Sequence, residues 1–306
     1  MRLPPALAAE SQPPAEVPPA QAMRAIGLCL LAHALIALSD VAAKLALQHH
    51  GVGEILFARG ALGGLMLGGP MIARNGIAVL VPRRPRLVLA RSTVHCAGSV
   101  CWYYAFAVMP LADVYAIGYA TPLVVSLMAI PLLGERVGWR LWGTTLIGFA
   151  GVLVMVRPGG DFWQPATLVI LAGIVLVALA RVIARRLALI ERVDVIVFWL
   201  ILAHIPVGLV AMIFTGAVWP TLASFAALFA MTAVNSGGHL LMTRAYALSP
   251  LSALGPYEYT TFVWALSFGV LVFHEVPGWA TLLGGLIVIA AGLLDLRRAR
   301  ATQTGG

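Results

Sequence analysis

Apolar residues along this chain of 306 residues lie in long blocks rather than in alternation with polar ones. Each block runs for about 20 residues, which is the length that an α-helix needs to cross a bilayer. The blocks lie at residues 25–47, 54–73, 87–109, 112–133, 140–156, 167–188, 195–216, 221–247, 251–273 and 279–296. The pattern therefore predicts an all-α membrane protein with ten transmembrane helices.

The segments between the blocks are short and carry Pro, Gly or charge, as in Pro82–Pro85 and Arg157–Gly160. The first 22 residues contain six prolines, so we expect a disordered cytoplasmic tail there. A signal peptide is not expected, because the first apolar block begins late and contains Asp40. Residues 298–306 are expected to form a second cytoplasmic tail.

Composition supports a membrane protein, since 61% of the residues are hydrophobic and only 10% are charged. A soluble domain carries about a quarter charged residues. The net charge of +8 does not indicate a nucleic-acid partner, because the basic residues lie between apolar blocks. The three cysteines lie inside apolar blocks without a CxxC pattern, which argues against a metal site or a disulfide framework. No cofactor is expected.

Lys and Arg residues also predict the orientation of the chain. If the N-terminus is cytoplasmic, sixteen of these residues fall in segments on the inner side of the membrane, and Arg91 is one of them. Only Lys44 and Arg157 fall on the outer side. Arg59 and Arg181 lie within spans. This asymmetry follows the positive-inside rule and predicts that both termini are cytoplasmic in a cell (inner) membrane protein.

The two halves of the chain resemble each other at a shift of 140 residues. The matched pairs are Pro110 and Pro250, Leu111 and Leu251, Tyr119 and Tyr259, Thr121 and Thr261, Glu135 and Glu275, Gly138 and Gly278, and Trp139 and Trp279. Each half contains five spans, and an odd number turns the second half upside down in the membrane. The sequence thus predicts two inverted five-helix repeats, at residues 23–157 and 165–297, an arrangement found in many secondary transporters.

Several motifs of the first half are specific to one family. They are Leu111–Ile117 (LADVYAI), Thr121–Leu123 (TPL), Leu133–Gly138 (LGERVG), Gly148–Gly151 (GFAG), Ser39-Asp40 with Lys44, and Arg59. These motifs resemble the EamA repeat of the drug/metabolite transporter superfamily, and most of all its permeases for S-adenosylmethionine or riboflavin. The second half departs from the pattern, with Ala253 in place of Asp113 and Phe262 in place of Pro122. The resemblance implies a ten-helix fold and transport of small metabolites.

Ionisable residues inside a span are costly and usually face a cavity or a partner. At about 1.5 Å per residue from the nearer helix end, they form two groups at different depths. The outer group comprises Asp40, Arg59, Tyr115 and Tyr119, with Lys44 able to pair with Asp40, and the inner group comprises Arg181, His239, Arg244 and Glu258. We interpret the groups as outer and inner gates of an alternating-access path. The alternative is that Asp40, Lys44 and Arg59 satisfy one another and only fix helix packing.

Aromatic side chains near the repeat interface are candidates for stacking on a flat or cationic substrate. Tyr119, Tyr259 and Trp264 lie deep enough to line a cavity, although most Trp and Tyr residues in membrane proteins are interface anchors. The candidate substrate-binding or gating residues are therefore Asp40, Lys44, Arg59, Trp102, Tyr115, Tyr119, Arg181, His239, Glu258, Tyr259 and Trp264.

Two further patterns allow both a functional and a structural interpretation. His33, His95 and His204 lie within spans, where they serve either proton coupling or a hydrogen bond to a neighbouring helix. Gly60, Gly64 and Gly68 form a smooth stripe that lets another helix approach closely, either within the monomer or across a homodimer.

These patterns together favour a secondary transporter for a small metabolite that is amino-acid-derived, vitamin-like or heteroaromatic. The alternatives are an intramembrane enzyme and a channel. No HExxH, GxSxG or Walker motif is present in the sequence, so catalytic residues are not expected. No filter-like segment favours a channel. The expected partners are the lipid bilayer and the small-molecule substrate, with proton coupling as an option.

Overall fold

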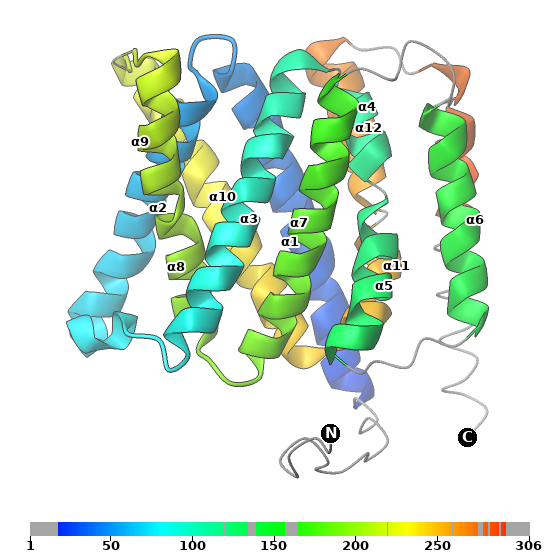
Figure 1. Ribbon diagram of the computed structural model, residues 1–306, viewed down its shortest axis with the longest axis horizontal. Coiled ribbons are helices and arrows are strands. Elements are labelled where there is room, and N and C mark those ends of the chain that lie inside the picture. Colours follow the sequence, from blue (N-terminus) through cyan, green and yellow to red (C-terminus); the bar gives the residue numbers. More distant parts are fainter. Residues whose placement is uncertain are drawn as a thin grey trace, which may run out of the picture.

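The computed structural model describes residues 18–109, 111–118, 120–133, 139–156, 165–218, 220–258, 260–274, 278–280, 282–287 and 289–291. Over these residues the protein is a bundle of helices without strands (Figure 1). The expected tails at residues 1–17 and 298–306 lie outside the described part. Residues 19–22, which we also expected in the tail, are helical instead, because proline is tolerated in the first turn of a helix.

The described helices follow the predicted apolar blocks. They are α1 (Pro19–Ala46), α2 (Val52–Asn75), the 3-10 helix η2 (Ile77–Leu80), α3 (Pro85–Val108), α4 (Leu111–Gly118), α5 (Thr121–Leu133), α6 (Trp139–Val156), α7 (Pro165–Ala188), α8 (Val193–Leu202), α9 (His204–Thr215), α10 (Leu222–Leu248), α11 (Leu251–Glu258) and α12 (Thr260–Phe273). The blocks at 112–133, 195–216 and 251–273 each contain two of these helices. The prediction of an all-α protein is confirmed for the described residues.

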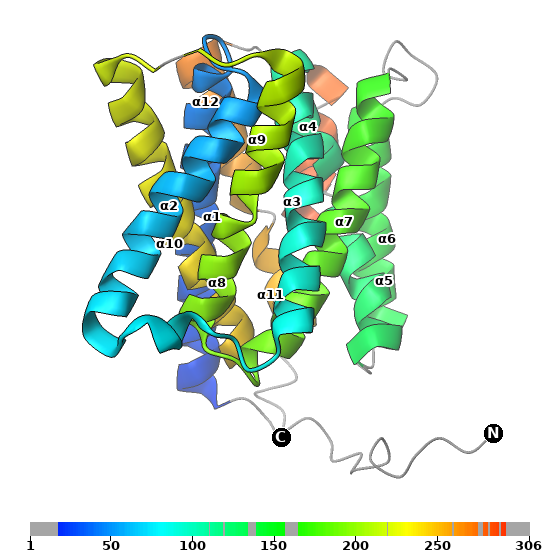
Figure 2. The same ribbon diagram turned by 60° about the vertical axis from the view of Figure 1, so that its left-hand side comes forward.

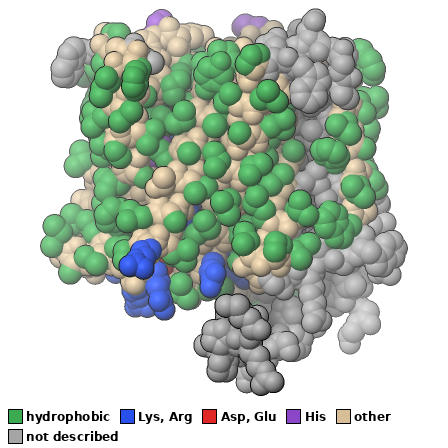
Figure 3. Space-filling view, viewed as in Figure 1, with side chains coloured by type: hydrophobic (Ala, Val, Ile, Leu, Met, Phe, Trp, Pro, Cys, Tyr) green, Lys and Arg blue, Asp and Glu red, His purple; other side chains and the backbone are tan. Residues whose placement is uncertain are grey.

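Five described segments are long and apolar enough to cross a membrane. They are Pro19–Ala46, Val52–Asn75, Pro165–Ala188, Val193–Phe214 and Leu222–Leu248. Large apolar side chains are exposed over the flanks of the bundle, as lipid-facing side chains are (Figure 3). The chain is therefore a multi-pass helical membrane protein.

Helices of the two halves pack against each other in pairs. The closest partners are α1 with α10, α3 with α7, and α2 with α8 and α9. Figures 1 and 2 show that α1 and α3 rise through the bundle while α7 and α10 descend. The cavity described below lies between these paired helices.

The glycine stripe on α2 is an intramolecular packing surface, which confirms the monomer interpretation of this stripe. A Cβ atom at Gly60 would lie 2.7 Å from the backbone nitrogen of Ile205, and one at Gly68 would lie 2.7 Å from the Phe198 ring. A Cβ atom at Gly208 on α9 would likewise collide with the backbone of Phe57 on α2. Small residues on both helices thus let α2 and α9 touch backbone to backbone.

Substitution of Gly60 by Ala is expected to destabilise the protein by about 1–3 kcal/mol, because the added methyl group meets a helix backbone that cannot move aside. Gly69 follows Gly68 in the sequence but lies outside the stripe, and no atom lies within 4 Å of the position that its Cβ atom would take. Gly69→Ala should therefore be neutral or stabilise the helix by about 0.5–1 kcal/mol. The melting temperatures of both variants in detergent test this, and equal melting temperatures would contradict the packing described here.

The span that contains α8 and α9 is interrupted at Ala203. Pro206 follows three residues later and has no N–H group to donate to Leu202, which favours the interruption. The Nδ1 atom of His204 lies 3.0 Å from the carbonyl oxygen of Leu200, so this side chain satisfies a carbonyl group beside the break. The ring is fully buried where α9 meets α3.

A carboxylate ties neighbouring loops together at each end of the bundle. Glu54, at the start of α2, accepts hydrogen bonds from the backbone N–H of Gly51 at 3.2 Å and from that of Val218. Glu191, before α8, accepts from the backbone N–H groups of Arg83 and Arg84. Figure 1 shows the start of α2 at the upper end and the start of α8 at the lower end.

Basic side chains gather at the lower end of the bundle, near η2 and the start of α3 (Figure 3). Exposed residues there include Arg74 at the end of α2 and Arg83, Arg84 and Arg86 at the joint before α3 and in its first turn. These positions agree with the segments that the sequence assigned to the inner side.

Candidate substrate cavity

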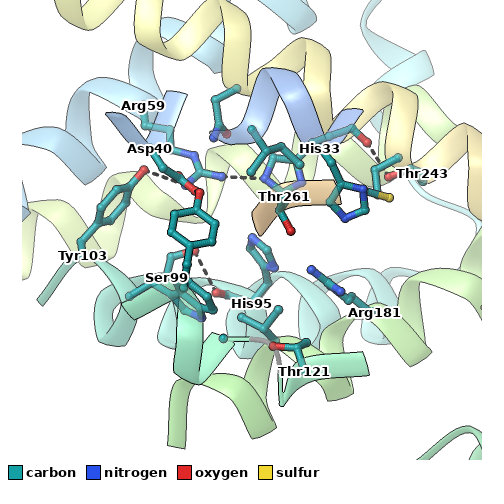
Figure 4. A pocket seen from close by; sticks show the side chains of 18 of the residues that line it. His33, Asp40, Arg59, His95, Ser99, Tyr103, Thr121, Arg181, Thr243 and Thr261 are labelled. Atoms are coloured by element: carbon teal, nitrogen blue, oxygen red, sulfur yellow. Dashed lines mark hydrogen bonds between the residues drawn. The ribbon is translucent and has the colours of Figure 1, made fainter. Parts of the chain in front are cut away.

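A cavity of about 150 Å³ lies within the bundle, lined by residues of both halves of the chain (Figure 4). The first half contributes His33, Ile36, Asp40, Arg59, Arg91, His95, Ser99, Trp102, Tyr103, Phe106, Tyr115, Gly118 and Thr121. The second half contributes Val177, Arg181, Asn235, His239, Met242, Thr243, Tyr246 and Thr261. Charged, polar and aromatic groups thus meet in the interior of an otherwise apolar bundle.

Asp40 lies on α1, and its Oδ2 atom accepts a hydrogen bond from the Tyr115 hydroxyl at 2.7 Å. The carboxylate also lies within electrostatic reach of Arg59. We proposed Lys44 as a possible partner of Asp40, but its Nζ atom donates to the carbonyl of Met109 at 3.4 Å. The same Nζ atom lies 4.9 Å from the centroid of the Phe273 ring. Lys44 is not among the described residues that line the cavity.

Arg59 joins the two halves of the chain at the cavity wall. Its Nη1 atom donates to the Tyr103 hydroxyl on α3 at 3.0 Å, and its Nη2 atom donates to Nε2 of His239 on α10 at 2.9 Å. Arginine stays protonated, so Nε2 of His239 must be the acceptor, and its ring carries its proton on Nδ1. Only 3% of the Arg59 surface is exposed, so this charge is held inside the protein.

Three histidines from three helices gather beside Arg59. The ring centroid of His95 lies 5.2 Å from that of His239 and 6.2 Å from that of His204, both edge to face. Nε2 of His204 lies 3.3 Å from Oγ of Ser99, which links α9 to α3. His33 instead contacts the Cys29 carbonyl in its own helix at 2.9 Å. Among the described residues no group of His, Cys, Asp or Glu has the arrangement of a metal site.

Arg91 is a buried charge that was not among the candidate site residues. We counted it with the charges on the inner side, near the start of the block at 87–109, and it lies in the second turn of α3 and is only 4% exposed. Its Nη1 atom donates to the carbonyl of Ile196 on α8 at 3.4 Å. The side chain is buried because the helix turns it toward α8.

Aromatic rings from α3 and α4 form one wall of the cavity. Trp102 contacts Phe106 and Tyr115 edge to face, with centroid distances of 5.9 and 6.1 Å. Tyr103 contacts Phe106 at 6.2 Å. This wall offers ring faces and edges beside the Asp40 carboxylate, which suits a flat or cationic group.

The structure brings together six of the eleven candidate residues. The candidates that line the cavity are Asp40, Arg59, Trp102, Tyr115, Arg181 and His239. Trp264 lies elsewhere, because 38% of its surface is exposed and its ring stacks on Phe268. Tyr119 and Tyr259 lie outside the described residues, and of Glu258 only the backbone, at the end of α11, is described.

The predicted separation of the polar residues into an outer and an inner group is wrong for the described side chains. Arg59, assigned to the outer group, bonds directly to His239, assigned to the inner group. Arg181 lines the same cavity as Asp40. Depth counted along single helices does not reveal which side chains of α2 and α10 meet where the two helices pack together.

Several lining residues that were not selected follow a simple pattern. His95, Ser99 and Tyr103 lie four residues apart on α3, and Asn235, His239 and Thr243 do so on α10. Residues spaced by four lie on one face of a helix, so each set is a polar stripe within an apolar span. This periodicity is the signal that would have identified them.

Comparison with known families agrees with the motifs. The model of the EamA-like transporter family matches residues 23–157, the range expected for the first repeat. Residues 23–157 are thus similar to the EamA-like transporter family. Asp40, Arg59 and the aromatic wall all lie within this matched range, and the resemblance inferred from the motifs is confirmed.

Curated relatives align with most of the chain. The S-adenosylmethionine uptake transporter of Rickettsia prowazekii is 26% identical over 273 residues, which cover 87% of this chain and 91% of that protein. The pseudopaline exporter CntI of Pseudomonas aeruginosa is 28% identical, with 78% and 84% covered. The riboflavin transporter of Rhizobium johnstonii is 26% identical, with 74% and 76% covered. All three are named as transporters or exporters.

The fold also resembles a solved structure that is described only as the crystal structure of a protein. The TM-score is 0.72 at 20% sequence identity, and the match covers 91% of this chain and 98% of the other. At this identity the likeness concerns the fold. It extends through both halves of the chain, so the two halves together form one known fold.

Proposed function

We propose that this protein is a secondary transporter with ten transmembrane helices in two inverted repeats, residues 23–157 and 165–297, which moves a small metabolite across the inner membrane by alternating access. The observation that carries this proposal is the composition of the cavity wall. Most of its residues occur in pairs that are related by the repeat, as expected of a site on the axis between two inverted halves.

Sixteen of the 21 described lining residues form pairs that are 140 or 141 positions apart. The pairs are Ile36 and Val177, Asp40 and Arg181, His95 and Asn235, Ser99 and His239, Trp102 and Met242, Tyr103 and Thr243, Phe106 and Tyr246, and Thr121 and Thr261. Equivalent helices therefore turn equivalent faces toward one shared space. The chemistry within the pairs differs, since Asp40 is matched by Arg181, so the two halves contribute opposite charges to the cavity.

Close helix contacts repeat with the same shift. A Cβ atom at Gly98 on α3 would meet Val177 and the Gly173 carbonyl on α7, and one at Gly238 on α10 would meet Ile36 and the Ala32 carbonyl on α1. In the described structure α1 and α7 run in opposite directions, as do α3 and α10 (Figures 1 and 2). This pairing supports an inverted relation between the halves.

Alternating access requires ends that open in turn, and the two carboxylates at opposite ends are suited to this. Glu54 holds the segment before α10 at one end, and Glu191 holds the segment before α3 at the other. These segments occupy equivalent places in the two repeats. Breaking the hydrogen bonds at one end while keeping those at the other provides a physical basis for two states.

The charge distribution supports cytoplasmic termini. Arg74, Arg83, Arg84 and Arg86 are exposed at the end of the bundle from which α1 starts (Figure 3). Under the positive-inside rule this end faces the cytoplasm.

The cargo that fits these residues is amino-acid-derived, vitamin-like or heteroaromatic. The cavity combines a carboxylate, guanidinium groups and a wall of rings. The curated relatives are named for S-adenosylmethionine, pseudopaline and riboflavin, and these names support the same range of compounds.

Flux into liposomes tests this function. Purified protein should take up one member of a panel of amino acids, vitamins and S-adenosylmethionine with saturation, whereas protein-free liposomes should not. Flux that rises linearly with concentration would instead indicate a channel. Chemical conversion of the added compound would indicate an enzyme.

A further inference from the structure

The part of the cavity between α2, α3 and α10 has an excess of positive charge. Among the described lining residues, Arg59, Arg91 and Arg181 carry guanidinium groups and Asp40 carries the carboxylate. Arginine does not lose its proton in proteins. If Arg181 is left out of the count, two permanently charged arginines and one carboxylate line this part of the cavity. The dielectric constant is low there, so an uncompensated charge raises the free energy of the folded protein.

The direct partners of Arg59 and Arg91 do not compensate their charges. Arg59 donates to the neutral hydroxyl of Tyr103 and to His239, and Arg91 donates to the Ile196 carbonyl. The two guanidinium groups are also electrostatic neighbours, so each disfavours the other. A bound anion would relieve both effects together.

A second observation concerns hydrogen-bond donors. The Nε atoms of Arg59 and Arg91 and the Nε1 atom of Trp102 are buried and have no hydrogen-bond partner within the described part of the chain. All three side chains line the cavity. Each of these nitrogen atoms is a donor, so a group that completes this wall supplies hydrogen-bond acceptors.

We propose that Arg59 and Arg91 form an anion subsite that binds a carboxylate or phosphate group of the cargo, while the rest of the cargo lies along the wall of Trp102 and Tyr115. This inference rests on the proposed transport function, because the subsite lies in the same cavity. Guanidinium groups suit the role, since their planar donors match the two oxygens of a carboxylate or phosphate group. Asp40 accepts its hydrogen bond from Tyr115, and the Nε donor of Arg59 has no hydrogen-bond partner within the described residues, so this donor is available to such a group.

Binding of simple probes to the purified protein in detergent tests the subsite without a transport assay. The probes are phenylacetate, its neutral amide phenylacetamide, and phenyl phosphate, each followed by the rise in melting temperature with concentration. Phenylacetate or phenyl phosphate should raise the melting temperature, and phenylacetamide should not. The stronger of the two acids identifies carboxylate or phosphate as the preferred group. Equal effects of acid and amide, or no effect of either acid, would overturn the proposal.

Variants of two arginines on α3 provide a second test of the subsite. Arg91→Gln should weaken the binding of the effective acid by about tenfold or more, as expected for loss of a charged hydrogen-bond donor. Arg86→Gln, at the exposed start of α3, should leave it unchanged. Because the comparison of acid with amide uses the unaltered protein, it stands even where Arg91→Gln fails to fold.

Binding and flux distinguish the two proposals from each other. Binding of the acid without saturable flux of any compound would keep the subsite and contradict the transporter. Saturable flux with equal binding of acid and amide would keep the transporter and contradict the subsite.

Discussion

Replacement of Arg59 by Gln is expected to reduce saturable transport by about 100-fold or more. The guanidinium group makes two hydrogen bonds, one to each half of the chain, and each bond to a charged group contributes about 1.5–3 kcal/mol. Loss of both leaves the Tyr103 hydroxyl and the His239 ring without their buried partner. Arg59→Lys should not restore transport, because a single ammonium group cannot reproduce the planar fork that spans α3 and α10.

The matched control is Arg74→Gln, which lies on the same helix but is exposed in its last turn. Transport by this variant should equal that of the unaltered protein. Expression level and melting temperature in detergent separate a folding defect from a transport defect. Normal transport by a well-folded Arg59→Gln variant would show that the link between the halves at this cavity has no part in the mechanism.

Replacement of Asp40 by Asn is expected to reduce transport by about 10-fold to 100-fold with little change in folding. Asn keeps an oxygen that accepts the Tyr115 hydroxyl, so the substitution removes the negative charge and preserves the contact. Among the described lining residues this carboxylate is the group that can attract the positive end of a zwitterionic or cationic cargo. Initial rates of uptake into liposomes, measured over a range of cargo concentrations, provide the test.

Two variants separate the charge of Asp40 from its hydrogen bond. Tyr115→Phe removes the bond and keeps the charge, so its effect on transport should be the smaller of the two. Asp194→Asn changes a carboxylate in an exposed pair with Arg192 and should have no effect on transport. A Tyr115→Phe variant as impaired as Asp40→Asn would instead indicate that the pair only fixes the packing of α1 against α4.

The helices were predictable because span length and hydrophobicity are properties of local sequence. The apolar blocks at 54–73 and 167–188 correspond closely to α2 and α7. The close approach at Gly60 was predictable as well, since a stripe of small residues has few other uses inside a membrane. The interruption at Ala203 could have been found from Pro206, whose missing N–H group weakens the helix one turn earlier.

The site was only partly predictable, because it depends on which helix faces meet. Charge in a span singled out Asp40, Arg59 and Arg181 without any knowledge of packing. Arg91 was missed because it lies near the start of the block at 87–109 and was counted only as an inner-side charge, and only the packing of α3 against α8 shows that it is buried. Trp264 was chosen by depth alone, and depth does not distinguish an inward face from an outward one.

The central claim is that the two halves lie upside down relative to each other around one cavity. Gly76 and Gly216 offer the most direct test, because both end a helix with positive φ, 74° and 78°, and lie 140 residues apart. The residues that follow them, Ile77 and Ala217, are both exposed. Each can be replaced by Cys in a variant whose three native cysteines are changed to Ala.

A thiol reagent that does not cross membranes then reports the side on which each Cys lies, in intact cells and in inside-out vesicles. Ile77→Cys should react only from the cytoplasmic side and Ala217→Cys only from the opposite side. Reaction of both residues from the same side would contradict the inverted arrangement.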